Sequence, residues 1–127
     1  MKGKARITSM CLVVVVFALI FSLTLETKAS AQKATVGIIQ YVEHPALDSA
    51  REGFLDALQE QGFVLDQNID IDYQNAQADF ANLSTISDRF IAKKVDLILA
   101  IATPAAQAVA GKTTSIPILG TAITDYV

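Results

Sequence analysis

Residues 34–62, ATVGIIQYVEHPALDSAREGFLDALQEQG, decide the fold, because two different hydrophobic periods follow one another within them. Residues 34–41 are a short run rich in β-branched side chains, which predicts a buried strand. Residues 45–61 predict a helix, since apolar side chains recur there at helical spacing, at Leu47, Ala50, Phe54 and Leu58. Pro45 suits the first turn of that helix, and Gly62 suits its C-terminal end.

The same alternation of strand and helix continues along the chain. We predict a strand near a sheet edge at 68–74 (NIDIDYQ), a helix at 80–94, a buried strand at 95–102 (VDLILAIA), a short helix at 104–110 and a last strand at 116–119 (IPIL). Such an order implies parallel strands joined by right-handed crossovers. The predicted fold is therefore a doubly wound, mostly parallel α/β sheet with helices on both faces, a class that hosts many unrelated functions.

The N-terminal segment has the pattern of a secretory signal peptide. Lys2, Lys4 and Arg6 precede an apolar run at 10–25, and Ala-Ser-Ala follows at 29–31. We therefore predict that residues 1–31 are removed after Ala31 and that the remainder is exported to the periplasm. A retained signal anchor is the alternative, although the apolar run is shorter than the roughly 20 residues that span a bilayer.

The part of the sequence after that segment is acidic. From Gln32 onward there are six Lys or Arg against twelve Asp or Glu, a balance of −6, and the only cysteine, Cys11, lies before it. An acidic surface argues against DNA, RNA and anionic lipid as partners. The length allows one domain, which must hold together without disulfides.

Ligands of doubly wound sheets meet the loops that follow the strands, and the loop at 102–107 carries the most information here. Thr103 is a candidate N-cap and Pro104 fits the first helical position, so the N–H groups of Ala105 and Ala106 would point out of the helix start. Because no acidic residue lies in that turn, a carboxylate or phosphate could bind there. The alternative is an ordinary capped helix whose amides are hydrated.

Two other loops follow strands, at 41–47 and 120–125. Glu43 and His44 could be an acid/base pair or metal ligands. Neighbouring side chains on an extended chain point in opposite directions, which argues against the pair. No second His or Cys follows residue 32 to complete a zinc site. Polar ligand contacts, or capping of the next helix by His44, are favoured. The hydroxyl-rich loop at 120–125 suits a small zwitterion, which Thr124 and backbone groups would bind, with an ordinary turn as the alternative. No dinucleotide, P-loop or nucleophile-elbow motif occurs, so we expect no enzyme activity, metal or cofactor.

Four phrases carry a resemblance to a known family. They are VGIIQYVEHPALDSAREGF at 36–54, QNAQAD at 74–79, DLILAIATPAAQA at 96–108 and IPILGTAITD at 116–125. They resemble the ABC-transporter substrate-binding proteins associated with tryptophan and other aromatic amino acids. The resemblance implies a two-lobed binding protein that closes around an amino acid, with an aromatic one favoured, and delivers it to a membrane permease.

The resemblance also implies roles for the residues already singled out. It places Glu43 and His44 near the cleft, Thr103, Ala105 and Ala106 at the solute carboxylate, and Ala122 and Thr124 near its α-amino end. Thr103 and Thr124 are the first choices. An exported α/β enzyme or a sensory ligand-binding domain on the same half-sheet is the alternative function.

Two features depart from the family pattern. Ala78 stands in QNAQAD where the family often has glycine. The sequence also stops at Val127, where the resemblance implies a fifth strand, hinge crossings and a second lobe. We therefore expect residues 32–127 to be part of one lobe, with weak or no solute binding on its own.

Overall fold

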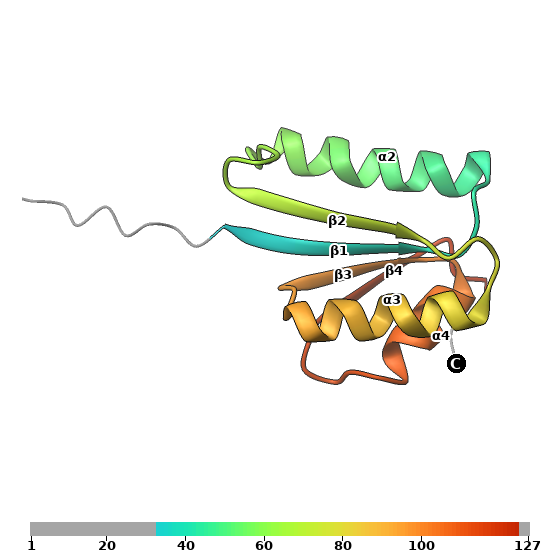
Figure 1. Ribbon diagram of the computed structural model, residues 1–127. Coiled ribbons are helices and arrows are strands. Elements are labelled where there is room, and N and C mark those ends of the chain that lie inside the picture. The colour runs from blue at the N-terminus through green and yellow to red at the C-terminus, as the bar shows by residue number, and fades with distance from the viewer. Residues whose placement is uncertain (1–32, 125–127) are drawn as a thin grey trace, which may run out of the picture. The chain divides into compact units, whose positions relative to one another are not determined.

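The computed structural model describes residues 33–124, and the predicted signal peptide at 1–31 lies outside the described residues. Strands and helices alternate in the predicted order (Figure 1): β1 (Ala34–Gln40), α2 (Pro45–Glu60), β2 (Ile69–Asn75), α3 (Phe80–Lys93), β3 (Leu97–Ile101), α4 (Thr103–Ala110) and β4 (Ile118–Thr121). No helix in this part of the chain has both the length and the apolar character needed to cross a membrane.

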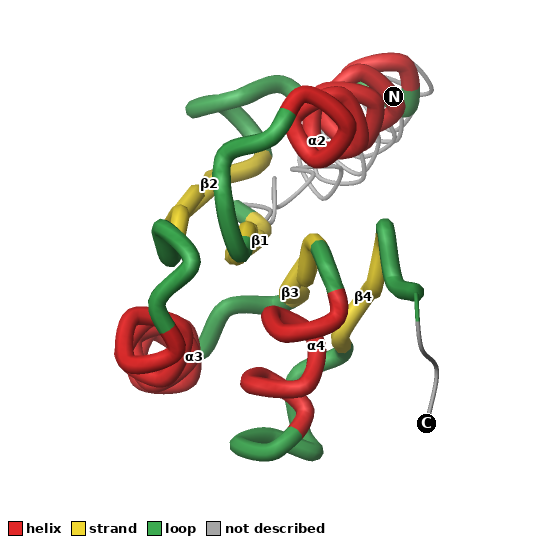
Figure 2. The backbone as a smooth tube through the Cα atoms, turned by 90° about the vertical axis from the view of Figure 1, so that its right-hand side faces the viewer, coloured by secondary structure: helices red, strands yellow, loops and turns green. Residues whose placement is uncertain are grey.

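The four strands form one parallel sheet in the order β2-β1-β3-β4. The order reverses between β1 and β3, because the chain leaves β1 toward β2 on one side and returns to β3 on the other. Helix α2 covers one face of the sheet, while α3 and α4 lie side by side on the other (Figures 1 and 2). The doubly wound α/β prediction is confirmed, and so is the prediction that the alternating strand β2 lies at an edge.

Side chains of β1 alternate between two apolar cores, as the pleat of a strand requires. Val36 and Ile38 pack with the side chains of α2, whereas Ile39 packs with those of α3 and α4. Gly37 also faces α3: a Cβ built on it would lie 2.7 Å from the ring of Phe90. The backbone of β1 and the Phe90 ring are therefore in direct contact.

Strand β4 lies two residues later than the sequence predicts. The predicted strand covers 116–119, but the observed strand pairs Gly120 with Ala100 and Thr121 with Ile101. Pro117 has no N–H and contributes only its carbonyl, which accepts from the Ile98 N–H at 3.0 Å. Pairing with β3 therefore extends the strand through small and polar residues that have no apolar pattern of their own.

Candidate functional site

The carboxyl ends of all four strands meet at one edge of the sheet, which faces the viewer in Figure 2. In a doubly wound sheet this edge, beside the point where the strand order reverses, is where ligands bind. The loops that follow β1, β2, β3 and β4 therefore form the candidate site.

The structure brings Thr103 and Thr124 together across the loops after β3 and β4. The Thr124 N–H donates to the Thr103 hydroxyl at 3.1 Å, and the two hydroxyl oxygens lie 3.2 Å apart. Thr103 is the first residue of α4 and not its N-cap, so that prediction is wrong: Ala102 holds the cap position, without a side-chain hydrogen bond. The Thr103 hydroxyl is directed to the neighbouring loop instead of to its own helix.

The prediction of two free amides at the start of α4 is wrong for Ala106. The Ala106 N–H donates to the Ala102 carbonyl at 3.2 Å, and Ala105 is completely buried. The first turn of α4 nevertheless contains no acidic residue. The positive end of its dipole is therefore not neutralised from within the helix.

The backbone is strained in both of the loops that carry the threonine pair. Ala102 has φ 81° and ψ 152°, and Ala122 has φ 53°, conformations that residues with a Cβ rarely adopt. The Ala102 N–H donates to the Thr121 carbonyl at 3.0 Å, which ties the two loops together. Such conformations cost about 1–3 kcal/mol each and cluster at ligand-binding positions.

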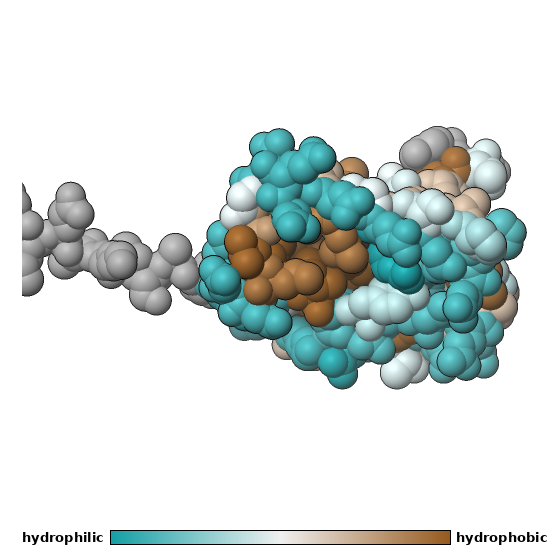
Figure 3. Space-filling model, turned by 90° about the horizontal axis from the view of Figure 1, so that it is seen from above, coloured by the Kyte–Doolittle hydropathy of each residue, from teal (hydrophilic) through white to brown (hydrophobic). Residues whose placement is uncertain are grey.

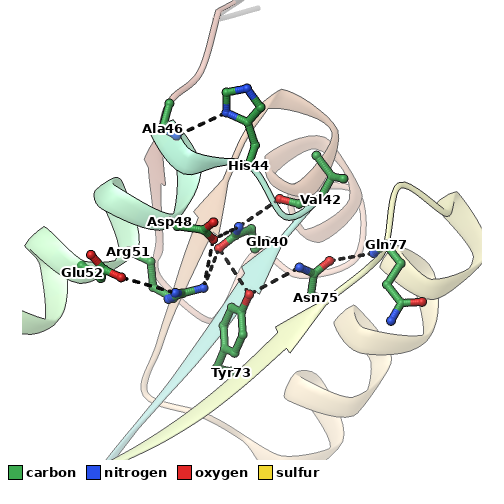
Figure 4. A network of polar contacts seen from close by, with 10 residues as sticks. All are labelled: Gln40, Val42, His44, Ala46, Asp48, Arg51, Glu52, Tyr73, Asn75 and Gln77. Atoms are coloured by element: carbon green, nitrogen blue, oxygen red, sulfur yellow. Dashed lines mark hydrogen bonds and ion pairs between the residues drawn. The ribbon is translucent and has the colours of Figure 1, made fainter.

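His44 and Glu43 lie in the loop between β1 and α2. His44 is the N-cap of α2, and its Nδ1 accepts the Ala46 N–H at 3.2 Å (Figure 4), which confirms the capping interpretation. Glu43 is exposed and lines an open hollow of about 810 Å³. The other lining residues are Val42, Asp48, Arg51, Glu52, Tyr73, Asn75 and Gln77.

A polar network beside this hollow holds the loop in place (Figure 4). The buried Gln40 amide nitrogen donates to the Val42 carbonyl at 2.9 Å and to the Asp48 carboxylate at 2.8 Å. Its amide oxygen accepts from Arg51 at 3.2 Å, and the Arg51 guanidinium lies 4.5 Å from the centre of the Tyr73 ring. The Gln40 side chain thus links α2 to Val42, the residue before Glu43.

Sequence reasoning did not find this network. One signal was present, because Asp48 and Arg51 are three residues apart and so lie on one face of α2, where they form an ion pair at 3.3 Å. The contributions of Gln40 and Tyr73 depend on how β1 and β2 pair, which no short pattern specifies. Within residues 33–124 no three His, Cys, Asp or Glu side chains are grouped so as to hold a metal ion.

Comparison with known proteins gives one family and several relatives. The family model described as ABC transporter substrate binding protein matches residues 35–127. A tyrosine-binding protein of Clostridioides difficile (strain R20291) is 48% identical over 98 residues, which are 77% of this chain and 28% of that protein.

Several solved structures are similar to this chain in both sequence and fold, among them the following two. One is the ligand-free, open structure of a substrate binding protein with adhesive properties from Clostridium difficile, with 52% identity, a TM-score of 0.71, and coverage of 72% of this chain and 31% of that one. The other is an ABC domain in complex with L-Trp from Streptococcus pneumonia, with 41% identity, a TM-score of 0.70, and coverage of 73% and 31%. The chain therefore spans less than a third of the length of each of these relatives.

Proposed function

Because the chain belongs to the family of ABC transporter substrate binding proteins, we propose that it forms part of an exported binding protein that captures an amino acid for a membrane permease. Two of the relatives are named for tyrosine binding and for a complex with L-Trp, which favours an aromatic solute. The proposed role is binding and delivery, without catalysis.

The single observation that carries the proposal is the Thr103–Thr124 pair at the carboxyl edge of the sheet. Two hydroxyls beside a helix start without acidic residues suit a carboxylate, since the hydroxyls donate and the helix dipole attracts negative charge. In this proposal the solute carboxylate lies at Thr103 and the turn of Ala105 and Ala106, and its ammonium lies toward Ala122 and Thr124.

Glu43 and His44 have a secondary place in the proposal. His44 already caps α2 through Nδ1, so only its other ring nitrogen is available to a ligand. Glu43 is exposed beside the open hollow, where its carboxylate attracts a positively charged group. We propose that these two residues contact the solute from the rim of the site.

The chain alone supplies one side of the proposed site. Its relatives are more than three times as long as the part that it matches, and a ligand enclosed from two sides loses more contact with water than one held on an open surface. We therefore expect millimolar affinity from this chain alone, and hinge closure in a longer protein to supply the rest.

Nuclear magnetic resonance titration tests the proposal at such affinity. The isotope-labelled chain is titrated with L-tryptophan and L-tyrosine while the backbone amide resonances are followed. We expect shifts grouped at 102–106 and 121–124. The proposal is abandoned if neither amino acid shifts any resonance up to its solubility limit, or if the shifts fall at the opposite edge of the sheet.

Replacement of Thr103 by valine tests the assignment of the site itself. The substitution Thr103→Val keeps the shape of the side chain but removes the hydroxyl, so we expect solute binding to weaken by about 1–3 kcal/mol if a ligand charge loses its partner. Thr85→Val is the matched control, because Thr85 donates its hydroxyl to the Ala81 carbonyl on the exposed surface of α3, away from the site. Equal affinities for the two variants would remove Thr103 from the site.

A further inference from the structure

Phe80 is an apolar side chain in an unusual place. Its exposed fraction is 69%, the highest among the large apolar side chains of the described residues, and it is the first residue of α3, at the carboxyl edge of the sheet. A single exposed apolar residue needs no explanation by itself. What distinguishes Phe80 is that its surroundings hold it in that position.

The ring of Phe80 lies against the ring of Tyr41. The two ring centroids are 5.8 Å apart and the planes are inclined at 47°, within the range of favourable aromatic pairs. The Tyr41 hydroxyl donates to the Ala78 carbonyl at 3.3 Å, which fixes the orientation of the tyrosine. Together the two rings form an aromatic pair with one face toward solvent.

The turn before Phe80 fixes the position at which α3 begins. Gln77 and Ala78 both have left-handed φ, at 55° and 61°. The Ala78 N–H donates to the Tyr41 carbonyl at 2.8 Å, the Gln77 N–H donates to the Asn75 side chain at 2.8 Å, and Asp79 caps α3. A strained turn secured by this many hydrogen bonds holds the backbone at Phe80 in one arrangement, beside Tyr41.

The aromatic pair and the proposed carboxylate site lie on loops that follow neighbouring strands, at the same edge of the sheet. The Tyr41 N–H donates to the carbonyl of Ile101, the residue before Ala102, at 3.3 Å. Tyr41 is therefore bonded on one side to the turn that leads to Phe80 and on the other to the strand that leads to Thr103. Adjacent strands are about 4.8 Å apart, which is comparable to the reach of an amino-acid side chain.

We propose that Tyr41 and Phe80 are the specificity-determining residues of the site and contact the ring of an aromatic solute whose carboxylate lies at Thr103. This inference rests on the proposed function and adds to it the surface that selects the side chain. An aliphatic amino acid would use the same carboxylate site but would gain no ring-to-ring contact. The aromatic pair thus discriminates between amino-acid side chains, while the threonines recognise the carboxylate and ammonium groups that all amino acids share.

The test uses Phe80→Ala and Phe80→Leu, with Phe63→Ala as the matched control. Phe63 is also an exposed phenylalanine, at 39%, but it follows α2 at the opposite edge of the sheet. Each variant is titrated with L-tryptophan and with L-leucine by the same resonance method. We expect Phe80→Ala to weaken L-tryptophan binding by about 2- to 10-fold and L-leucine binding much less. Phe80→Leu should resemble Phe80→Ala for L-tryptophan, and Phe63→Ala should resemble the unmodified chain.

The outcomes separate this inference from the proposed function. If L-tryptophan shifts the resonances of Thr103 and Thr124 but binds to Phe80→Ala with unchanged affinity, the role of the aromatic pair is overturned. The proposed function then stands. An equal loss of affinity for L-tryptophan and L-leucine also overturns the role of the aromatic pair, because the effect is then not selective for aromatic side chains. The absence of shifts with either amino acid overturns both. Well-dispersed spectra of the variants confirm that they fold.

Discussion

Within the described residues, six residues other than glycine have positive φ, and Ala78 is one of them. A left-handed conformation brings Cβ close to the following carbonyl oxygen, at a cost of roughly 1–2 kcal/mol. At Ala78 the hydrogen bonds to Tyr41 compensate for this cost.

We therefore predict that Ala78→Gly stabilises the fold. Glycine removes the clash but loses more conformational freedom on folding, so the expected net gain in the free energy of unfolding is about 0.5–1 kcal/mol. Ala57→Gly, on the exposed surface of α2, is the control and should cost about 1 kcal/mol. Urea unfolding midpoints measure both, and a lower midpoint for Ala78→Gly would contradict the explanation by backbone strain.

At the residue scale, the sequence predicts which side chains lie close together. It is less successful in predicting which hydrogen bonds they form. Thr103 and Thr124 each follow a strand, which predicts that they share one edge of the sheet, and the structure brings their hydroxyls together. The predicted role of Thr103 as an N-cap is wrong, because Ala102 adopts a φ/ψ combination that is rare for residues with a Cβ. Backbone strain of that kind depends on tertiary hydrogen bonds, such as that from Ala102 to Thr121, and these leave no local pattern.

Helix α3 and strand β1 are in direct contact at Gly37 and Phe90. The ring of Phe90 is completely buried and occupies the space that a Cβ of residue 37 would need. Glycine at this position lets the helix approach the sheet, and neither backbone nor ring can shift far within a packed core.

Gly37→Ala is accordingly expected to destabilise the fold by about 1–3 kcal/mol through overpacking. Gly53→Ala is the matched control: a Cβ on Gly53, in α2, would meet no atom within 4 Å, so alanine should stabilise the helix by about 0.5–1 kcal/mol. Thermal or urea unfolding of the two variants checks the opposite signs. A stabilising effect at both positions would mean that α3 moves freely against β1.

An ionic contact also joins α3 to the sheet, at Asp72 of β2. Burial raises the pKa of Asp72, but hydrogen bonds from Lys93, Gln74 and Arg89, with the charge of Arg89, outweigh burial and hold the pKa below its usual 3.8. A carboxyl whose pKa is lower in the folded state than in the unfolded state stabilises the fold above the unfolded pKa. That contribution is lost as the pH falls through the folded pKa.

We predict that Asp72→Asn weakens the dependence of stability on pH in the acid range. The free energy of unfolding of the unmodified chain should fall on acidification, and the variant should lose less because its neutral side chain cannot titrate. Asp56→Asn, which removes a carboxylate from the exposed surface of α2, is the control variant. Identical profiles for Asp72→Asn and the unmodified chain would remove Asp72 as a source of acid sensitivity.

The type and order of the elements follow from the sequence, whereas some of their ends do not. Strong periodicity identifies every strand and helix from β1 to α4 to within two residues. Strand β4 is shifted because its partner β3 determines its pairing, and the prediction relies on its apolar residues alone. The Gln40 network escapes prediction, since it joins three elements whose relative register is a property of the folded sheet.

At the scale of the whole described part, two groups of exposed apolar side chains bear on association between molecules, besides the aromatic pair and Tyr73. One is an apolar patch at Phe63, Val64 and Leu65, beside a hollow of about 270 Å³, visible as the brown area in Figure 3. The other is Leu119 on β4, which is 47% exposed although its partner on β3, Leu99, is buried. Within residues 33–124, β4 pairs with β3 alone and lies at the edge of the sheet.

We expect the chain to self-associate at high concentration, chiefly through the β4 edge. An edge strand offers unpaired backbone groups as well as apolar side chains, and a charged residue there opposes pairing between molecules. Leu119→Lys should therefore lower the weight-average mass in a concentration series by sedimentation, more than Leu65→Lys in the apolar patch. If Leu65→Lys has the larger effect, the patch carries the association and the β4 edge does not, because apolar area then outweighs the open backbone.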